Sequence, residues 1–142
     1  MKPLRVVVDC NVLISMLIGG KLTGLRDYLL SDEVRLTVSE RLLAEVLDVG
    51  GRSHLEKYFD AERLRWFIAL LRDVGELTVD KASPAAISRD PDDDYLLALS
   101  DTARADVLIT GDVDLLVLEK HGRTRIMNAR AFVEEFLEER DR

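Results

Sequence analysis

The chain has 142 residues, of which 47% are hydrophobic and 33% are charged, a balance typical of a globular protein rather than a disordered one. Its formal net charge of -7 argues against binding nucleic acid through a basic surface alone, because contacts to phosphate usually need Lys and Arg. A protein whose acidic side chains hold metal cations is the exception. The length predicts one domain over residues 1–142 with a substantial core.

The single cysteine, Cys10, leaves no partner for an internal disulfide, which indicates a reducing cytoplasmic setting. We expect Cys10 to be a small buried side chain rather than a nucleophile. The first apolar run is too short for a signal peptide, and no stretch is long enough to span a bilayer, so no membrane partner is expected.

Apolar runs and helical repeats alternate along the chain. We expect strands at residues 4–8, 34–38, 76–79, 107–110 and 124–127. We expect helices at residues 12–18, 23–30, 39–49, 60–74 and 90–103, a short one within 111–119, and a terminal one after Asn128. This alternation predicts an α/β fold with a central parallel sheet of four or five strands and helices on both faces.

Polar side chains follow the first and fourth predicted strands. Asp9 and Asn11 come directly after the first, and Thr110, Asp112 and Asp114 come after the fourth. In a parallel sheet these positions share the carboxyl edge, where binding sites lie. Each group also has an ordinary reading as a turn, in which a short polar side chain bonds its own backbone.

Two further acidic features belong to predicted helices. The run of acids at residues 90–94 begins one helix, where it could serve as a cap, and Glu45 lies within another, where it could simply be solvated. Several carboxylates at one sheet edge would repel one another, and a hard divalent cation with oxygen ligands would relieve this repulsion. Zinc is not expected, because His54 and His121 are far apart and have no cysteine partner.

Four stretches, in this order, resemble the PIN-domain family, close to the VapC-like toxin components of type II toxin–antitoxin modules. They are residues 6–15 (VVVDCNVLIS), residues 39–45 (SERLLAE), residues 90–99 (DPDDDYLLAL) and residues 105–116 (ADVLITGDVDLL). The resemblance covers nearly the whole chain. It implies a three-layer PIN-like fold and a metal-dependent ribonuclease that hydrolyses RNA phosphodiesters.

The resemblance also implies roles for single residues. The catalytic and metal-binding quartet would be Asp9, Glu45, Asp94 and Asp112, holding Mg²⁺ or Mn²⁺. Supporting residues would be Asn11, Asp93, Thr110 and Asp114. Either Asp93 or Asp94 could be the third acid of the quartet, because the run of consecutive acids allows the match to the family pattern to shift by one residue.

The same resemblance implies an RNA substrate, a cognate antitoxin protein and a homodimer. An apolar set could form the dimer surface or belong to the core, and it comprises Met16, Leu17, Ile18, Leu22 and Leu25. A basic group on the middle helices could follow RNA phosphates or be an ordinary solvated face, and it comprises Arg52, Lys57, Arg63, Arg65 and Arg72. We expect Trp66 to be a core residue rather than a base-stacking one.

Two other functions remain open from the residues. An aspartyl-nucleophile phosphatase or phosphotransferase also places an acid after the first strand and needs magnesium. Enzymes resembling the haloacid dehalogenase group usually carry a second Asp and a Thr soon after the nucleophile, where this chain has Asn11 and Ile14. The other alternative is a non-catalytic PIN-like interaction module, against which the intact set of acids argues.

Overall fold

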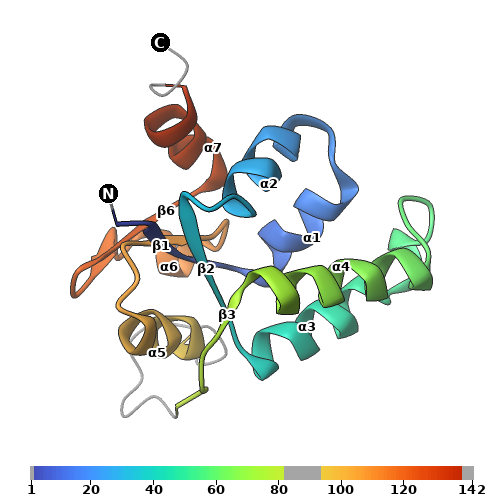
Figure 1. Ribbon diagram of the computed structural model, residues 1–142, viewed down its shortest axis with the longest axis horizontal. Coiled ribbons are helices and arrows are strands. Elements are labelled where there is room, and N and C mark those ends of the chain that lie inside the picture. The colour runs from blue at the N-terminus through green and yellow to red at the C-terminus, as the bar shows by residue number, and fades with distance from the viewer. Residues whose placement is uncertain (1, 82–93, 139–142) are drawn as a thin grey trace.

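The computed structural model describes residues 2–81 and 94–138. Its six strands form one sheet in the order β3-β2-β1-β4-β6-β5, in which only the β5–β6 pairing is antiparallel (Figure 1). The strands are β1 (Leu4–Val8), β2 (Val34–Val38), β3 (Glu76–Leu77), β4 (Val107–Ile109), β5 (Lys120–His121) and β6 (Thr124–Met127). The predicted α/β class with a central parallel sheet is therefore confirmed, and the sheet is parallel except for the β5–β6 pairing.

Helices flank this sheet, with α5 on the opposite side from α1 and α2 (Figure 1). The α-helices are α1 (Cys10–Ile18), α2 (Thr23–Leu29), α3 (Glu40–Gly50), α4 (Ala61–Val74), α5 (Asp94–Ala103), α6 (Val113–Leu116) and α7 (Ala129–Phe132). Short helical turns occupy Gly20–Leu22 and Ser53–Leu55, and α7 continues as a π-helical turn over Val133–Leu137. No helix in residues 2–81 and 94–138 is long and apolar enough to cross a membrane.

Local sequence explains where these elements begin. Val6, Val7 and Val8 of β1 are fully buried, as expected for a central strand covered on both faces. Ser39 caps α3 by accepting a hydrogen bond from the Leu42 amide, and side chains at the starts of α4 and α7 cap those helices in the same way. The predicted boundaries of these three helices are thereby explained by side-chain capping.

The sheet has six strands, where the sequence predicted four or five. The additional strand, β5, forms a two-residue hairpin with β6 around Gly122, whose φ of +58° suits glycine. A pairing this short carries no hydrophobic repeat that sequence reading could detect. The start of the helix predicted over residues 90–103 lies outside the described residues, and α5 is described from Asp94 onward.

The structure decides between the two readings of the apolar set and corrects one packing prediction. Met16, Leu17 and Leu25 are buried, which confirms the core reading for these three residues, whereas Ile18 is 40% exposed. Trp66 was expected in the core, but half of it is exposed. The Arg63 guanidinium lies 4.3 Å from the centre of the Trp66 ring, so one turn of α4 covers the indole with a charged side chain.

Candidate active site

Asp9 is a buried carboxylate held between two strands. It follows β1 and caps α1, and 7% of its surface is exposed. Its backbone N–H donates to the Ile109 carbonyl of β4 at 2.9 Å. One carboxylate oxygen accepts from the Asn11 amide at 3.3 Å, and the other accepts from the Thr110 hydroxyl at 2.6 Å. These contacts fix the position of the carboxylate at the carboxyl edge of the sheet.

Thr110 connects the ends of three strands at this edge. It follows β4, is fully buried, and its amide donates to the Met127 carbonyl of β6 at 3.0 Å. Its hydroxyl donates to Asp9 and also accepts from the Asp112 amide at 3.0 Å. Two hydrogen bonds through the Thr110 hydroxyl therefore connect the Asp112 backbone to the Asp9 carboxylate. The Asp112 side chain caps α6 by accepting from the Asp114 amide at 2.8 Å.

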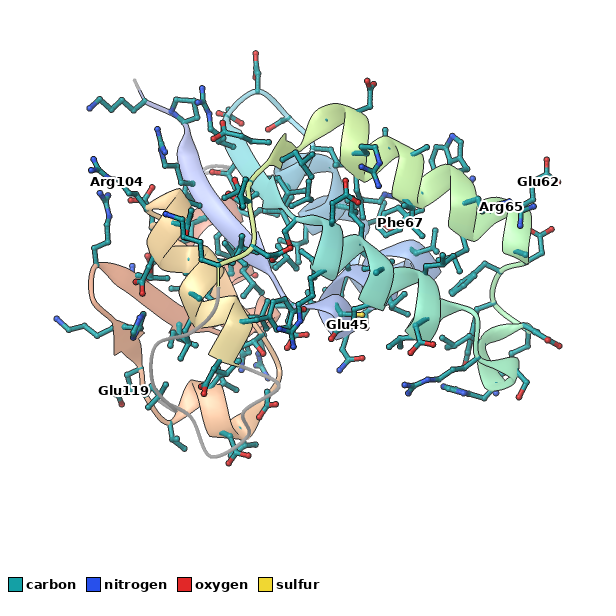
Figure 2. The ribbon with its side chains drawn as sticks, turned by 90° about the horizontal axis from the view of Figure 1, so that it is seen from below. Glu45, Glu62, Arg65, Phe67, Arg104 and Glu119 are labelled. Atoms are coloured by element: carbon teal, nitrogen blue, oxygen red, sulfur yellow. The ribbon has the colours of Figure 1, made fainter. Side chains whose placement is uncertain are left out.

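Glu45 approaches the same edge from α3. Figure 2 shows it near the middle of the molecule, far from Glu62 and Arg65 at the start of α4. The Tyr95 hydroxyl of α5 donates to a Glu45 oxygen at 2.9 Å. The Arg41 guanidinium lies 4.1 Å from the centre of the Tyr95 ring. Tyr95 thus links α3 to α5 and determines where the Glu45 carboxylate points.

Electrostatic coupling places Asp9, Glu45, Cys10 and Tyr95 in one neighbourhood. Burial raises the pKa of the Cys10 thiol to about 12, and the charges of Glu45 and Asp9 contribute to this rise. Burial also raises the pKa of Tyr95, with further contributions from the Glu45 charge, its hydrogen bond and the Asp9 charge. Both groups therefore stay protonated near neutral pH. The prediction that Cys10 is a buried side chain is confirmed, since 2% of its surface is exposed.

Asp94 begins α5 and is 4% exposed. Arg5 in β1 donates to the carbonyl of Ala103, the last residue of α5, at 3.2 Å, so α5 ends near the amino edge of the sheet. A ten-residue helix is about 15 Å long, which brings its first residues toward the carboxyl edge. The contact of Tyr95 with Glu45 agrees with this direction. Asp93, the competing residue, lies outside the described residues.

The donor atoms at this edge are of the type that a hard divalent cation prefers. Asp9 and Glu45 offer carboxylate oxygens, each with lone pairs beyond the hydrogen bonds it accepts. Among residues 2–81 and 94–138, however, no three His, Cys, Asp or Glu side chains lie together as a metal-binding group. The residues therefore fit the cation by donor chemistry, without a preassembled three-ligand cluster in the described part.

Sequence reading missed Tyr95, whose hydroxyl orients Glu45. The signal was slight, namely a polar aromatic residue directly after the predicted ligand Asp94. Asn11 was expected to support the site by hydrogen bonding, and the contact present uses its backbone amide.

Most side chains of the predicted basic group interact with neighbouring side chains of the protein. Arg72 forms a bidentate pair with Glu40, and Arg52 lies 3.9 Å from Asp48. Arg63 covers an indole ring, as described above.

Comparison with known proteins agrees with this arrangement. The sequence model of the PIN domain matches residues 5–114, which is more than half of the chain. The matched segment includes Asp9, Glu45, Asp94, Thr110 and Asp112. A search of curated proteins gave no match. The chain belongs to the PIN domain family, whose members are generally nucleases that use divalent metal ions.

Proposed function

We propose that the protein is a ribonuclease that hydrolyses RNA phosphodiesters with Mg²⁺ or Mn²⁺. The observation that carries this proposal is the buried Asp9 carboxylate, bonded by Thr110 at the sheet edge that Glu45 and Asp112 also approach. A buried carboxylate is costly unless hydrogen bonds or a cation compensate its charge. Asp9 has two hydrogen bonds and lies close enough to Glu45 for both charges to act on Cys10.

In this proposal Asp9, Glu45, Asp94 and Asp112 hold the cation. The bound metal supplies polarisation of a phosphoryl oxygen and a lower pKa for an attacking water. Thr110 positions Asp9, and Tyr95 positions Glu45, as outer residues do in metal sites. The Cys10 thiol stays protonated, and a protonated thiol is a poor metal ligand. The carboxylate oxygens are therefore the ligands that we propose at this edge.

The biological setting is part of the proposal. The resemblance to VapC-like toxins supports a toxin that acts on cellular RNA in the cytoplasm, forms a homodimer and is neutralised by an antitoxin. A neighbouring small open reading frame for a DNA-binding protein would support the pairing. Light scattering at high protein concentration tests the dimer, and a strictly monomeric mass would argue against it.

An aspartyl phosphatase is less well supported. Both Asp9 oxygens accept hydrogen bonds from the protein, which supports a positioned metal ligand more than a freely presented nucleophile. Incubation with acetyl phosphate followed by mass spectrometry would detect an aspartyl phosphate and favour that alternative.

A cleavage assay tests the nuclease directly. Fluorescent single-stranded RNA is incubated with protein in Mg²⁺, in Mn²⁺ and in EDTA. We expect cleavage with either metal, none in EDTA, and none for Asp9→Asn. The matched control is Asp27→Asn, the same chemical change at an exposed position of α2. Equal cleavage by wild type and Asp9→Asn would remove Asp9 from the site. Absence of metal-dependent cleavage across varied RNAs would favour a non-catalytic interaction module.

A further inference from the structure

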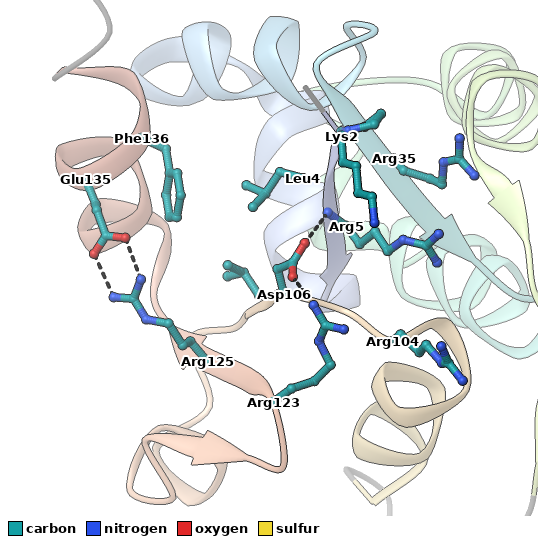
Figure 3. A pocket seen from close by; sticks show the side chains of 12 residues that line it. Lys2, Leu4, Arg5, Arg35, Arg104, Asp106, Arg123, Arg125, Glu135 and Phe136 are labelled. Carbon is teal, nitrogen blue, oxygen red and sulfur yellow. Dashed lines mark hydrogen bonds and ion pairs between the residues drawn. The ribbon is translucent and has the colours of Figure 1, made fainter.

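A second feature lies at the amino edge of the sheet. A cavity of about 780 Å³ opens beside the first residues of β1, β2, β4 and β6 (Figure 3). Asp9 and Thr110 follow the carboxyl ends of β1 and β4, so they lie at the opposite edge. A five-residue strand spans about 16 Å, which separates the cavity from the candidate active site.

The cavity concentrates positive charge in a chain whose net charge is -7. Six cationic side chains and two carboxylates are among the residues that line it. The cations are Lys2, Arg5, Arg35, Arg104, Arg123 and Arg125, and the carboxylates are Asp106 and Glu135. These cationic side chains would repel one another unless nearby anions compensate their charge.

Three of the cations have acidic partners in the protein. Arg125 forms a bidentate pair with Glu135, and Arg123 donates to Asp106 at 2.7 Å (Figure 3). Arg35 forms an ion pair with a glutamate of β3 at 3.1 Å. These pairs fix the walls of the cavity rather than leave it fully cationic.

The side chains of the other three cations, Lys2, Arg5 and Arg104, form no ion pair with a carboxylate among the described residues, although the Arg5 backbone amide donates to Asp106 at 2.9 Å. The Arg5 guanidinium donates to the backbone carbonyl of Ala103, the last residue of α5. The carboxyl end of a helix carries partial negative charge, which accounts for part of this attraction to cations. It does not account for three full charges around one cavity.

The backbone of Arg104 is also unusual. Its φ of 54° lies in the left-handed region, and it directly follows α5, at a position where helices usually place glycine. A non-glycine residue held in this conformation is strained, and such residues cluster at functional positions. Here the strained residue is an arginine that lines the cavity.

We propose that this cavity binds the phosphate groups of a nucleotide, either free or within an RNA strand. The planar guanidinium fork matches phosphate oxygens, and the cations without acidic partners offer charge to a phosphate dianion. Leu4 and Phe136 provide an apolar wall on which a base can lie. The volume is in the range of sites for small ligands, about 300–1,000 Å³.

Fluorescence anisotropy tests the site without cleavage. The probe is a fluorescein-labelled, 5′-phosphorylated RNA of about ten nucleotides, titrated with the full chain in EDTA. We expect Arg104→Gln to weaken binding about tenfold, because it loses a charge-assisted contact to phosphate. Arg130→Gln is the matched control, since Arg130 lies outside the cavity with its side chain 88% exposed, and its binding should equal that of wild type.

A second variant separates binding from folding. Arg104→Gly removes the guanidinium but suits the left-handed backbone, so its thermal midpoint should be equal to or above that of wild type while its binding falls. Unchanged binding in both Arg104 variants, or an equal loss in Arg130→Gln, would overturn the proposal. Competition by ATP would indicate a free nucleotide, and competition by unlabelled RNA alone would indicate a strand. Stronger competition by an oligoglutamate peptide than by either would replace the nucleotide with an acidic protein segment.

Discussion

The Thr110 hydroxyl donates a 2.6 Å hydrogen bond to the Asp9 carboxylate and accepts one from the Asp112 amide. One side chain therefore joins the acid that follows β1 to the acid that follows β4. The hydroxyl is fully buried, so no water replaces it easily. The consequences can be measured separately as stability and as metal affinity.

Replacing Thr110 with Val keeps the shape and removes the hydroxyl. The Asp9 oxygen and the Asp112 amide each lose a partner, which should cost about 1–3 kcal/mol of unfolding free energy. Urea denaturation measures this loss. Thr110→Ser keeps the hydroxyl and should lose about 0.8 kcal/mol, for the missing methyl group. A Val variant as stable as the Ser variant would show that the hydrogen bonds contribute little.

Replacing Asp9 with Asn should leave stability nearly unchanged without metal and lower it, relative to the wild type, when metal is bound. In EDTA the loss of repulsion with Glu45 offsets the weaker cap, so the change should be within about 1 kcal/mol. In saturating Mg²⁺ the wild type gains about 2.7 kcal/mol at one hundred times the Kd, and the variant gains less. Thermal melts in both conditions test this. Equal magnesium-dependent gains for both proteins would indicate that Asp9 is not a ligand.

Replacing Tyr95 with Phe removes the donor to Glu45 and keeps the aromatic ring under Arg41. We expect roughly 10- to 100-fold weaker Mg²⁺ binding, the usual effect of losing a residue that orients a ligand. Isothermal titration calorimetry measures the affinity. Tyr58→Phe is the matched control, because Tyr58 is 53% exposed and its ring lies 5.1 Å from the Lys57 ammonium. Identical affinities in the two variants would leave Tyr95 a packing residue.

The Cys10 thiol makes stability depend on alkaline pH. Its pKa rises from an ordinary value of 9.0 to about 12 in the folded chain, so the folded state holds the proton more tightly. The stabilisation is complete below pH 9 and is lost as the pH rises toward 12. At pH 10.5 the loss from this group is about 2 kcal/mol. Urea denaturation at pH 7 and 10.5 should show a smaller loss for Cys10→Ala than for wild type, and equal losses would contradict the coupling.

Much of the fold could be predicted from local sequence. Val6–Val8 marks a buried central strand, and Ser39 and Asp60 mark helix starts through side-chain capping. The hairpin around Gly122 could not be predicted, because two-residue strands depend on tertiary pairing rather than on a repeat. The exposure of Trp66 could not be predicted either, because an indole beside an apolar stripe resembles a core residue until its neighbours are known.

For the candidate site, strand order and residue type were sufficient to bring Asp9, Thr110 and Asp112 to one edge. The contact between Tyr95 and Glu45 joins two helices separated by long stretches of chain, and no sequence spacing encodes it. The role of the acids as ligands stays a prediction. The left-handed Arg104 was also invisible, since glycine is the residue that sequence reading associates with that backbone conformation.

The opposite positions of the acids and the arginine-lined cavity give the molecule an electric polarity along its strands. The two edges are separated by about 16 Å, roughly twice the Debye length at physiological salt. At that salt concentration the charges of the acidic edge and those of the cavity therefore act on a polyanion almost independently. At about 0.01 M salt the Debye length reaches about 30 Å and exceeds this separation. Without bound metal, the acidic edge would then oppose the attraction of the arginines, and we expect an approaching RNA to meet the cavity first.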